Sequence, residues 1–98
     1  MNTTFVPNPT VCSIIDIRWQ DQYATGHIAG SINIPSDRIL SHIERLKEMR
    51  TPIVLCCQSG FRSRQAARIL LLKGVKDVID GGDYRVLSRK YDLPIEVI

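Results

Sequence analysis

Short apolar runs alternate with longer amphipathic segments along most of the chain. Four runs rich in β-branched residues predict strands over residues 11–17, 31–34, 53–57 and 77–79. Nearly continuous apolar runs of this length are typical of strands that are covered on both faces, as in a parallel sheet. Pro35 ends the second run, and Gly81 with Gly82 closes the fourth.

Between these runs the apolar spacing changes to that of amphipathic helices. The first predicted helix spans about residues 37–49, with Ser36 as its N-cap. The second follows the third strand, and Gly74 is its expected C-terminal stop. Its apolar stripe consists of Ala66, Ala67, Leu70 and Leu71. Two shorter helices are predicted over residues 19–25 and 84–91.

Strands that alternate with helices predict βαβ units. We therefore expect a small three-layer α/β domain with a mostly parallel central sheet flanked by helices. A single domain over residues 1–98 is expected, because no repeat or linker interrupts the chain. In such sheets the binding crevice lies beyond the carboxyl ends of the strands. Three predicted strands bring residues 16–18, Cys57 and the Gly81–Gly82 pair to that edge.

The composition narrows the classes of function. The 13 Lys and Arg residues give a net charge of only +3 and are scattered among 10 acidic residues, so no nucleic-acid partner is expected. No apolar run approaches the roughly 20 residues of a membrane span, so no membrane association is expected. Residues 1–7 lack a basic segment followed by an apolar stretch, which predicts no secretory signal and a cytoplasmic location.

Three cysteines, two of them adjacent, argue against a disulfide framework. With two histidines and no Cys-x-x-Cys spacing, the sequence also predicts no metal site. At least one thiol is therefore either part of the core or a reactive nucleophile. We interpret Cys12, in the first strand, as a core residue. Cys56 alternates with Cys57 along the third strand, so it should point to the opposite face.

The segment from Cys57 to Ser63 carries the chemistry, because it joins a predicted strand to a predicted helix. Free N–H groups and the positive end of the helix dipole stabilise a negative sulfur at this place. Gly60 allows successive amide groups to turn inward as an anion-binding nest, and Arg62 adds a permanent positive charge. The loop therefore predicts a reactive Cys57 at the floor of an anion-binding cradle.

This loop resembles the active-site loop of the rhodanese-like family in its single-domain form: Cys, two residues, Gly, one residue, Arg and Ser. Residues 15–18 with 23–35 resemble the first signature of that family, and Gly81–Gly82 resembles the double glycine near its end. The three blocks follow one another in the family's order. Two positions depart from the pattern: Gln22 replaces a usual acidic residue, and Tyr84 stands where Trp is usual.

The resemblance implies a sulfurtransferase that moves sulfane sulfur from an anionic donor to a nucleophilic acceptor through a persulfide on Cys57. The donor would be thiosulfate or a low-molecular-weight persulfide, and the acceptor a thiol, a cyanide-like nucleophile or a protein. No metal or organic cofactor is implied. By position, the substrate-binding residues would be Gln58, Ser59, Gly60, Phe61, Arg62, Ser63 and Arg18.

Five residues near this edge are predicted to support the site or to have more than one role. We expect Asp16 to fix the active loop by hydrogen bonds, whereas Arg18 can hold either Asp16 or substrate. His27 would be a structural histidine that bonds the loop backbone, according to the resemblance. Trp19 and Tyr84 are candidate walls of the pocket.

Two alternatives remain open from the sequence. Counted from Cys56, five residues precede Arg62, which is the spacing of cysteine phosphatases and arsenate reductases. No histidine precedes Cys56, however, and Gly60 falls one place late for that pattern. The other alternative is a non-catalytic rhodanese-fold module that binds a partner, which the presence of both Cys57 and Arg62 disfavours.

Overall fold

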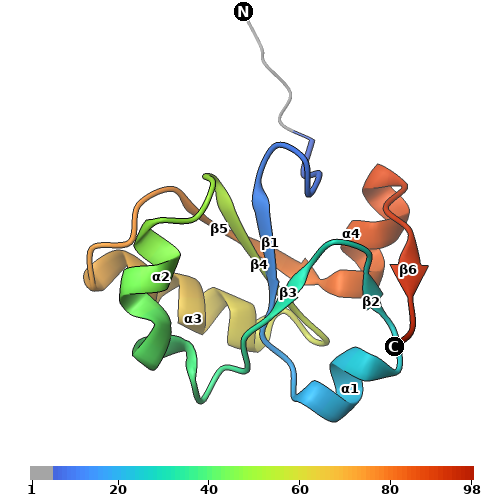
Figure 1. The fold of residues 1–98 in the computed structure, drawn as a ribbon, viewed down its shortest axis with the longest axis horizontal. Helices are drawn as coiled ribbons and strands as arrows, with labels where there is room; N and C mark the ends of the chain where they lie inside the picture. The colour runs from blue at the N-terminus through green and yellow to red at the C-terminus, as the bar shows by residue number, and fades with distance from the viewer. Residues whose placement is uncertain (1–5) are drawn as a thin grey trace, which may run out of the picture.

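The computed structural model describes residues 6–98 and confirms the predicted α/β class (Figure 1). Four parallel strands form the central sheet. Their order across the sheet is β3 (Ile32–Asn33), β1 (Ser13–Asp16), β4 (Ile53–Cys57) and β5 (Val78–Asp83). Residues 1–5, on which the expected lack of a signal segment partly rests, lie outside the described residues. Within residues 6–98, no helix combines the length and apolar character that a membrane span requires.

Two buried clusters occupy the two faces of the sheet. On one face, η1 (Ile39–His42), α2 (Ile43–Lys47) and α3 (Phe61–Leu72) pack against the side chains of β1 and β4. On the other face, α4 (Tyr84–Tyr91) packs with residues that include Cys12, Val54 and Cys56. The strands therefore lie between α2 and α3 on one side and α4 on the other (Figure 1). Alternate residues of β4 thus enter different cores, as its continuous apolar sequence predicted.

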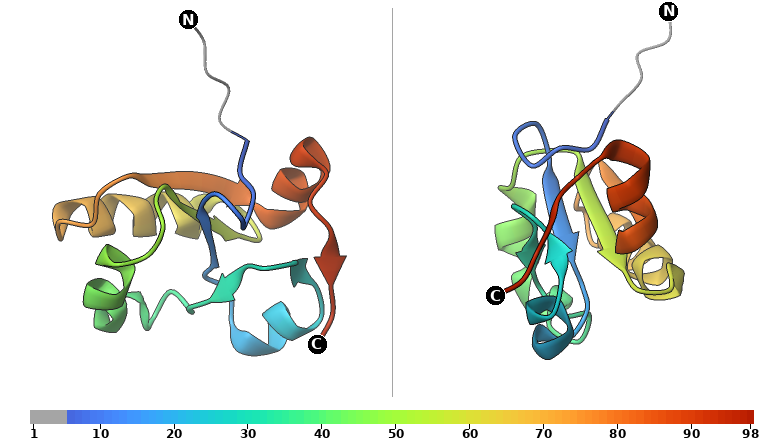
Figure 2. Two further views of the ribbon diagram at one scale, coloured as in Figure 1. Left: turned by 45° about the horizontal axis from the view of Figure 1, so that its top comes forward. Right: turned by 90° about the vertical axis from the view of Figure 1, so that its right-hand side faces the viewer.

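Outside the main sheet, β2 (His27–Ile28) pairs in the antiparallel sense with β6 (Ile95–Glu96) near the C-terminus. Figure 2 shows this pair beside α1 (Gln20–Ala24), away from the central strands. The amide of Ile98 donates a hydrogen bond to the carbonyl of Ala24 and fixes this end of the chain. Neither strand was predicted, because their pairing depends on contact between segments that lie far apart in the chain.

The predicted helix over residues 37–49 is wrong in its continuity and in its N-cap. A 3-10 turn, η1, precedes the α-helix α2, and η1 begins after Arg38 rather than after Ser36. The side chains of Ser41 and His42 both bond the Arg38 carbonyl, at 2.7 and 2.9 Å. Such side chains compete with the regular helical pattern for backbone groups, which accounts for the break.

The fourth strand is longer than predicted because it continues through the glycine pair. In the register with β4, Leu55 faces Asp80 and Cys56 faces Gly82, which leaves Gly81 as the extra residue of a bulge. A Cβ atom at Gly81 would lie 2.7 Å from Val54 Cγ1 and 2.8 Å from the Leu55 carbonyl oxygen. Only glycine fits here, so the pair that was expected to end the strand instead bends it around β4.

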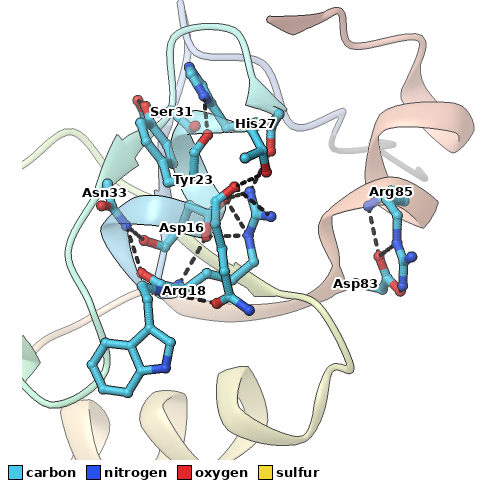
Figure 3. Close-up of polar contacts among 12 residues, drawn as sticks. Asp16, Arg18, Tyr23, His27, Ser31, Asn33, Asp83 and Arg85 are labelled. Atoms are coloured by element: carbon cyan, nitrogen blue, oxygen red, sulfur yellow. Dashed lines mark hydrogen bonds and ion pairs between the residues drawn. The ribbon is translucent and has the colours of Figure 1, made fainter. Parts of the chain in front are cut away.

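A buried ion pair lies at the carboxyl end of β1 (Figure 3). Arg18 Nη2 lies 2.7 Å from Asp16 Oδ2, and the two side chains are 4% and 0% exposed. The same guanidinium donates to the Gly26 carbonyl at 2.6 Å and lies 3.8 Å from the centre of the Tyr84 ring. The pair therefore joins β1 to the segment after α1 and to α4.

We expect Asp16→Asn to lower the free energy of unfolding by about 3–5 kcal/mol, because it leaves the Arg18 charge buried without its partner. The matched control is Asp83→Asn, since Asp83 pairs with an Arg85 side chain that is 50% exposed and Asn is an equally good N-cap. Asp83→Asn should lower the free energy of unfolding by less than about 1 kcal/mol. Urea denaturation at neutral pH measures both, and equal losses would contradict the importance of the buried pair.

Candidate functional site

Cys57, the last residue of β4, lies at the floor of a pocket of about 350 Å³ at the predicted edge of the sheet. The residue is only 1% exposed and also packs in the core that α3 covers. The Gly60 amide donates a hydrogen bond to its Sγ, with an N···S distance of 2.9 Å. The residues that line the pocket are Arg18, Gln22, Cys57, Gln58, Ser59 and Arg62.

Gly60 gives the loop its shape. Its φ of +83° is in the left-handed region, and it is the N-cap of α3. A Cβ atom there would lie 3.6 Å from Gly82 Cα, so the loop lies directly on the bulge of β5. The N-terminus of α3, which has no acidic residue in its first turn, therefore faces the sulfur with its positive dipole end.

Arg62 lies at the rim of the pocket, where its side chain is exposed. Its guanidinium carbon lies 5.6 Å from the centre of the Trp19 ring, a cation–π distance. Trp19 thus supports Arg62, and it lines a separate groove of about 600 Å³ that Cys57 does not line. Although that groove is the larger, no cysteine lines it, so the candidate site is the smaller pocket.

Arg18 lines the same pocket, but its side chain is already engaged. Nε and Nη2 bond Asp16 and the Gly26 carbonyl, and Nη1 lies 3.4 Å from the Gln22 carbonyl. Burial would lower the pKa of Arg18, but hydrogen bonds and the charge of Asp16 leave that pKa above its ordinary value. Of the two roles predicted for Arg18, the structure shows that of holding Asp16.

The prediction that Asp16 fixes the active loop is wrong, because its carboxylate accepts from the amide and guanidinium of Arg18. His27 bonds backbone as predicted, but at α1 and not in the active loop. Its ring stacks on Tyr23 at 3.7 Å, and its Nδ1 lies 2.7 Å from the Tyr23 carbonyl (Figure 3). Its Nε2 lies 3.3 Å from Glu96 Oε1. Asp16 therefore supports the pocket through Arg18, which lines it, whereas His27 supports α1.

Cys56 points away from the pocket, as the strand alternation predicted, into the core that contains Leu87. Burial and the nearby charge of Asp16 raise the pKa of the Cys56 thiol well above its ordinary value. Burial likewise raises the pKa of Cys12. The phosphatase spacing counted from Cys56 would therefore need a thiol on the opposite face of the sheet from Arg62 and the pocket.

Three of the loop residues predicted to bind substrate, Gly60, Phe61 and Ser63, do not line the pocket. Phe61 is 61% exposed, and the Ser63 side chain is fully buried. The Ser63 hydroxyl lies 2.6 Å from Asp80 Oδ1, which directs it toward β5 and away from Cys57. Ser63 is thus part of the support of the cradle.

Sequence reasoning missed three charged residues around the glycine pair: Asp80, Asp83 and Arg85. Asp83 accepts from the Arg85 amide and guanidinium, and Arg85 Nη2 lies 3.3 Å from the Gln58 carbonyl (Figure 3 shows the Asp83–Arg85 pair). Asp80 bonds both Ser63 and the Gly82 amide. Their position at the end of a predicted strand was the available signal. In residues 6–98, no three His, Cys, Asp or Glu side chains gather as a possible metal site.

The family model described as "Rhodanese-like domain" matches residues 6–82. Thiosulfate sulfurtransferase GlpE of Pseudomonas fluorescens is 37% identical over 71 residues, which cover 70% of this chain and 64% of that protein. A tRNA uridine(34) hydroxylase of Hamiltonella defensa is 33% identical over 93 residues, which cover 86% of this chain and 26% of that protein. A solved rhodanese with anions from E. coli has a TM-score of 0.72 and 27% identity, with 88% of this chain and 98% of that one covered.

These relatives differ in how much of their length the chain spans. It spans just under two thirds of the sulfurtransferase and about a quarter of the hydroxylase. The similarity therefore concerns the domain described above and not the whole of every relative.

We expect iodoacetamide to modify Cys57 before Cys56 or Cys12 in the folded protein near neutral pH. The raised pKa values of Cys56 and Cys12 keep those buried thiols protonated, whereas Cys57 faces the pocket and accepts the Gly60 N–H. Peptide mapping by mass spectrometry after partial alkylation identifies the site. Preferential modification of Cys56 would contradict this assignment and favour the shifted register.

Proposed function

Because the chain belongs to the rhodanese-like domain family, we propose that it is a rhodanese-type sulfurtransferase that uses Cys57 as its nucleophile. The observation that carries the proposal is the Gly60 N–H donated to Cys57 Sγ at the N-terminal end of α3. A donor aimed at the sulfur, a helix dipole and Arg62 at the rim all favour negative charge at one point. Negative charge is what both an attacking thiolate and a bound persulfide carry.

The proposed reaction has two displacement steps. The Cys57 thiolate attacks the outer sulfur of thiosulfate, the S–S bond breaks, and sulfite leaves with the bonding electron pair. An acceptor thiolate or cyanide then attacks the terminal sulfur of the Cys57 persulfide, and Cys57 leaves again as a thiolate. No net oxidant is required, because each step transfers sulfur with six valence electrons between nucleophiles.

An anionic donor is supported by the charges at the pocket. Arg62 lies at the mouth of the pocket, whereas the charge of Arg18 is balanced by Asp16. Arg is suited to oxyanions because its planar guanidinium can donate two parallel hydrogen bonds. The rhodanese of E. coli with which the chain shares its fold was solved with anions, which agrees with such a donor. Thiosulfate or a low-molecular-weight persulfide would meet these requirements.

The acceptor must reach a sulfur that is almost entirely buried. A persulfide places its terminal atom one bond farther out, toward the opening of the pocket. We propose a thiol or cyanide-like acceptor, either small or presented by a protein. The sulfur carrier protein to which this chain is also similar is consistent with a protein acceptor.

Incubation with thiosulfate should add one sulfur atom to the protein, and cyanide should remove it. Cys57→Ser should abolish this addition, because it removes the nucleophile. The matched control is Cys56→Ser, which changes the neighbouring thiol in the other core and should keep the sulfur addition at the cost of some stability. Intact-protein mass spectrometry measures both. If neither thiosulfate nor glutathione persulfide adds a cyanide-removable sulfur that depends on Cys57, the sulfurtransferase proposal fails.

Arg62→Ala should lower kcat/KM for thiosulfate about tenfold to a hundredfold. A charged hydrogen bond to a bound anion is typically worth about 1.5–3 kcal/mol, which corresponds to that range. Arg64→Ala is the control, because Arg64 is also exposed on α3 but does not line the pocket. Steady-state kinetics should leave the Arg64 variant within about twofold of the parent. Equal effects of the two substitutions would remove Arg62 from donor binding.

A further inference from the structure

A single carboxylate oxygen behind the cradle accepts two hydrogen bonds. Asp80 Oδ1 lies 2.6 Å from the Ser63 hydroxyl and 3.0 Å from the Gly82 amide nitrogen. Ser63 belongs to the first turn of α3 and is fully buried, and Gly82 belongs to the bulge of β5. Asp80 therefore connects the helix that follows the loop to the strand on which the loop lies.

The Ser63 hydroxyl has one proton and two acceptors within reach, Asp80 Oδ1 and the Gly60 carbonyl at 3.0 Å. The Gly60 carbonyl already accepts the Arg64 amide at 3.2 Å. A carboxylate at the shorter distance is the stronger acceptor, so the proton belongs on the bond to Asp80. Ser63 is thus held from the side of β5.

These contacts hold the loop on both sides of the Gly60 amide. Ser63, which Asp80 holds, follows Gly60 along the chain. Gly82, which Asp80 also holds, lies beneath Gly60, because a Cβ atom added at Gly60 would be 3.6 Å from Gly82 Cα. Between the two anchors, the Gly60 N–H donates to Cys57 Sγ at 2.9 Å. Hydrogen bonds weaken steeply as their angle departs from linearity, so a small tilt of the loop would reduce this contact.

We propose that Asp80 is a positioning residue of the Cys57 pocket. Through its bonds to Ser63 and Gly82, Asp80 holds the Gly60 amide against Cys57. The inference rests on the proposed function in that Cys57 is its nucleophile. Asp80 does not line the pocket and does not touch the substrate. It acts by aiming a donor that belongs to another residue.

The positioning role can be separated from a simple charge effect because the two predict opposite signs. A carboxylate near a thiolate disfavours it, so removal of the Asp80 charge alone should make Cys57 more reactive at neutral pH. Loss of the acceptor releases Ser63 and Gly82 and should make Cys57 less reactive. Asp80→Asn removes the charge but keeps an oxygen acceptor, whereas Asp80→Ala removes both.

The experiment follows Cys57 alkylation by iodoacetamide as a function of pH in the full chain, without any sulfur donor. We expect Asp80→Ala to alkylate about two- to tenfold more slowly near pH 7, with its pH midpoint moved upward, since one net hydrogen bond is of that size. Asp80→Asn should match or exceed the parent rate. Asp37→Ala is the control, because it removes an exposed carboxylate outside the loop and should not change the rate.

An Asp80→Ala rate equal to or faster than that of the parent would overturn the proposal. If this variant does not fold, Ser63→Ala decides: it removes the bond to Asp80 from the other side, and slow alkylation supports the proposal while the parent rate overturns it. Because alkylation needs no sulfur donor, the test is independent of turnover. Failure of the parent to take up sulfur would overturn the proposed function and leave the role of Asp80 standing.

Discussion

The shape of the Cys57 pocket depends on how closely β5 approaches the end of β4 and the loop that follows β4. A Cβ atom added at Gly81 would lie less than 3 Å from atoms of β4. At the next residue, Gly82, the backbone of β5 lies against the loop at Gly60. The bulge that these two glycines form bends β5 around the end of β4. A side chain at Gly81 would clash with Val54 and the Leu55 carbonyl, so it would push β5 away from β4 and displace the surface on which the loop lies.

The opposite wall of the pocket is built by a different interaction. There the buried Asp16–Arg18 pair replaces close backbone packing, and it brings Gly26 and Tyr84 to the same guanidinium. A buried charge without its partner is costly, so this wall has little freedom to rearrange. Cys57 therefore lies between one wall fixed by steric fit and one fixed by charge.

Part of this arrangement could be predicted from the local sequence, and there is a physical reason why the rest could not. The strand at residues 53–57 and the helix at 84–91 were predicted with their observed bounds, because their apolar patterns are undisturbed. The position of the Cys57 loop between a strand and a helix was also predicted. The bonds of Asp80 to Ser63, 17 residues apart, and of His27 to Glu96, 69 residues apart, could not be predicted. Such contacts depend on tertiary packing, which carries no periodic signal in the chain.

Adjacent thiols on one strand show how position determines their chemistry. Cys56 and Cys57 have the same intrinsic reactivity, but successive side chains of a strand point to opposite faces. Cys56 faces an apolar core and the charge of Asp16, which raise its pKa and keep it neutral. Cys57 instead meets the Gly60 amide and the N-terminus of α3, which favour a negative sulfur. A shift of one residue in the register of β4 would turn Cys57 to the opposite face, so the alignment of β4 with β1 and β5 determines which cysteine faces the pocket.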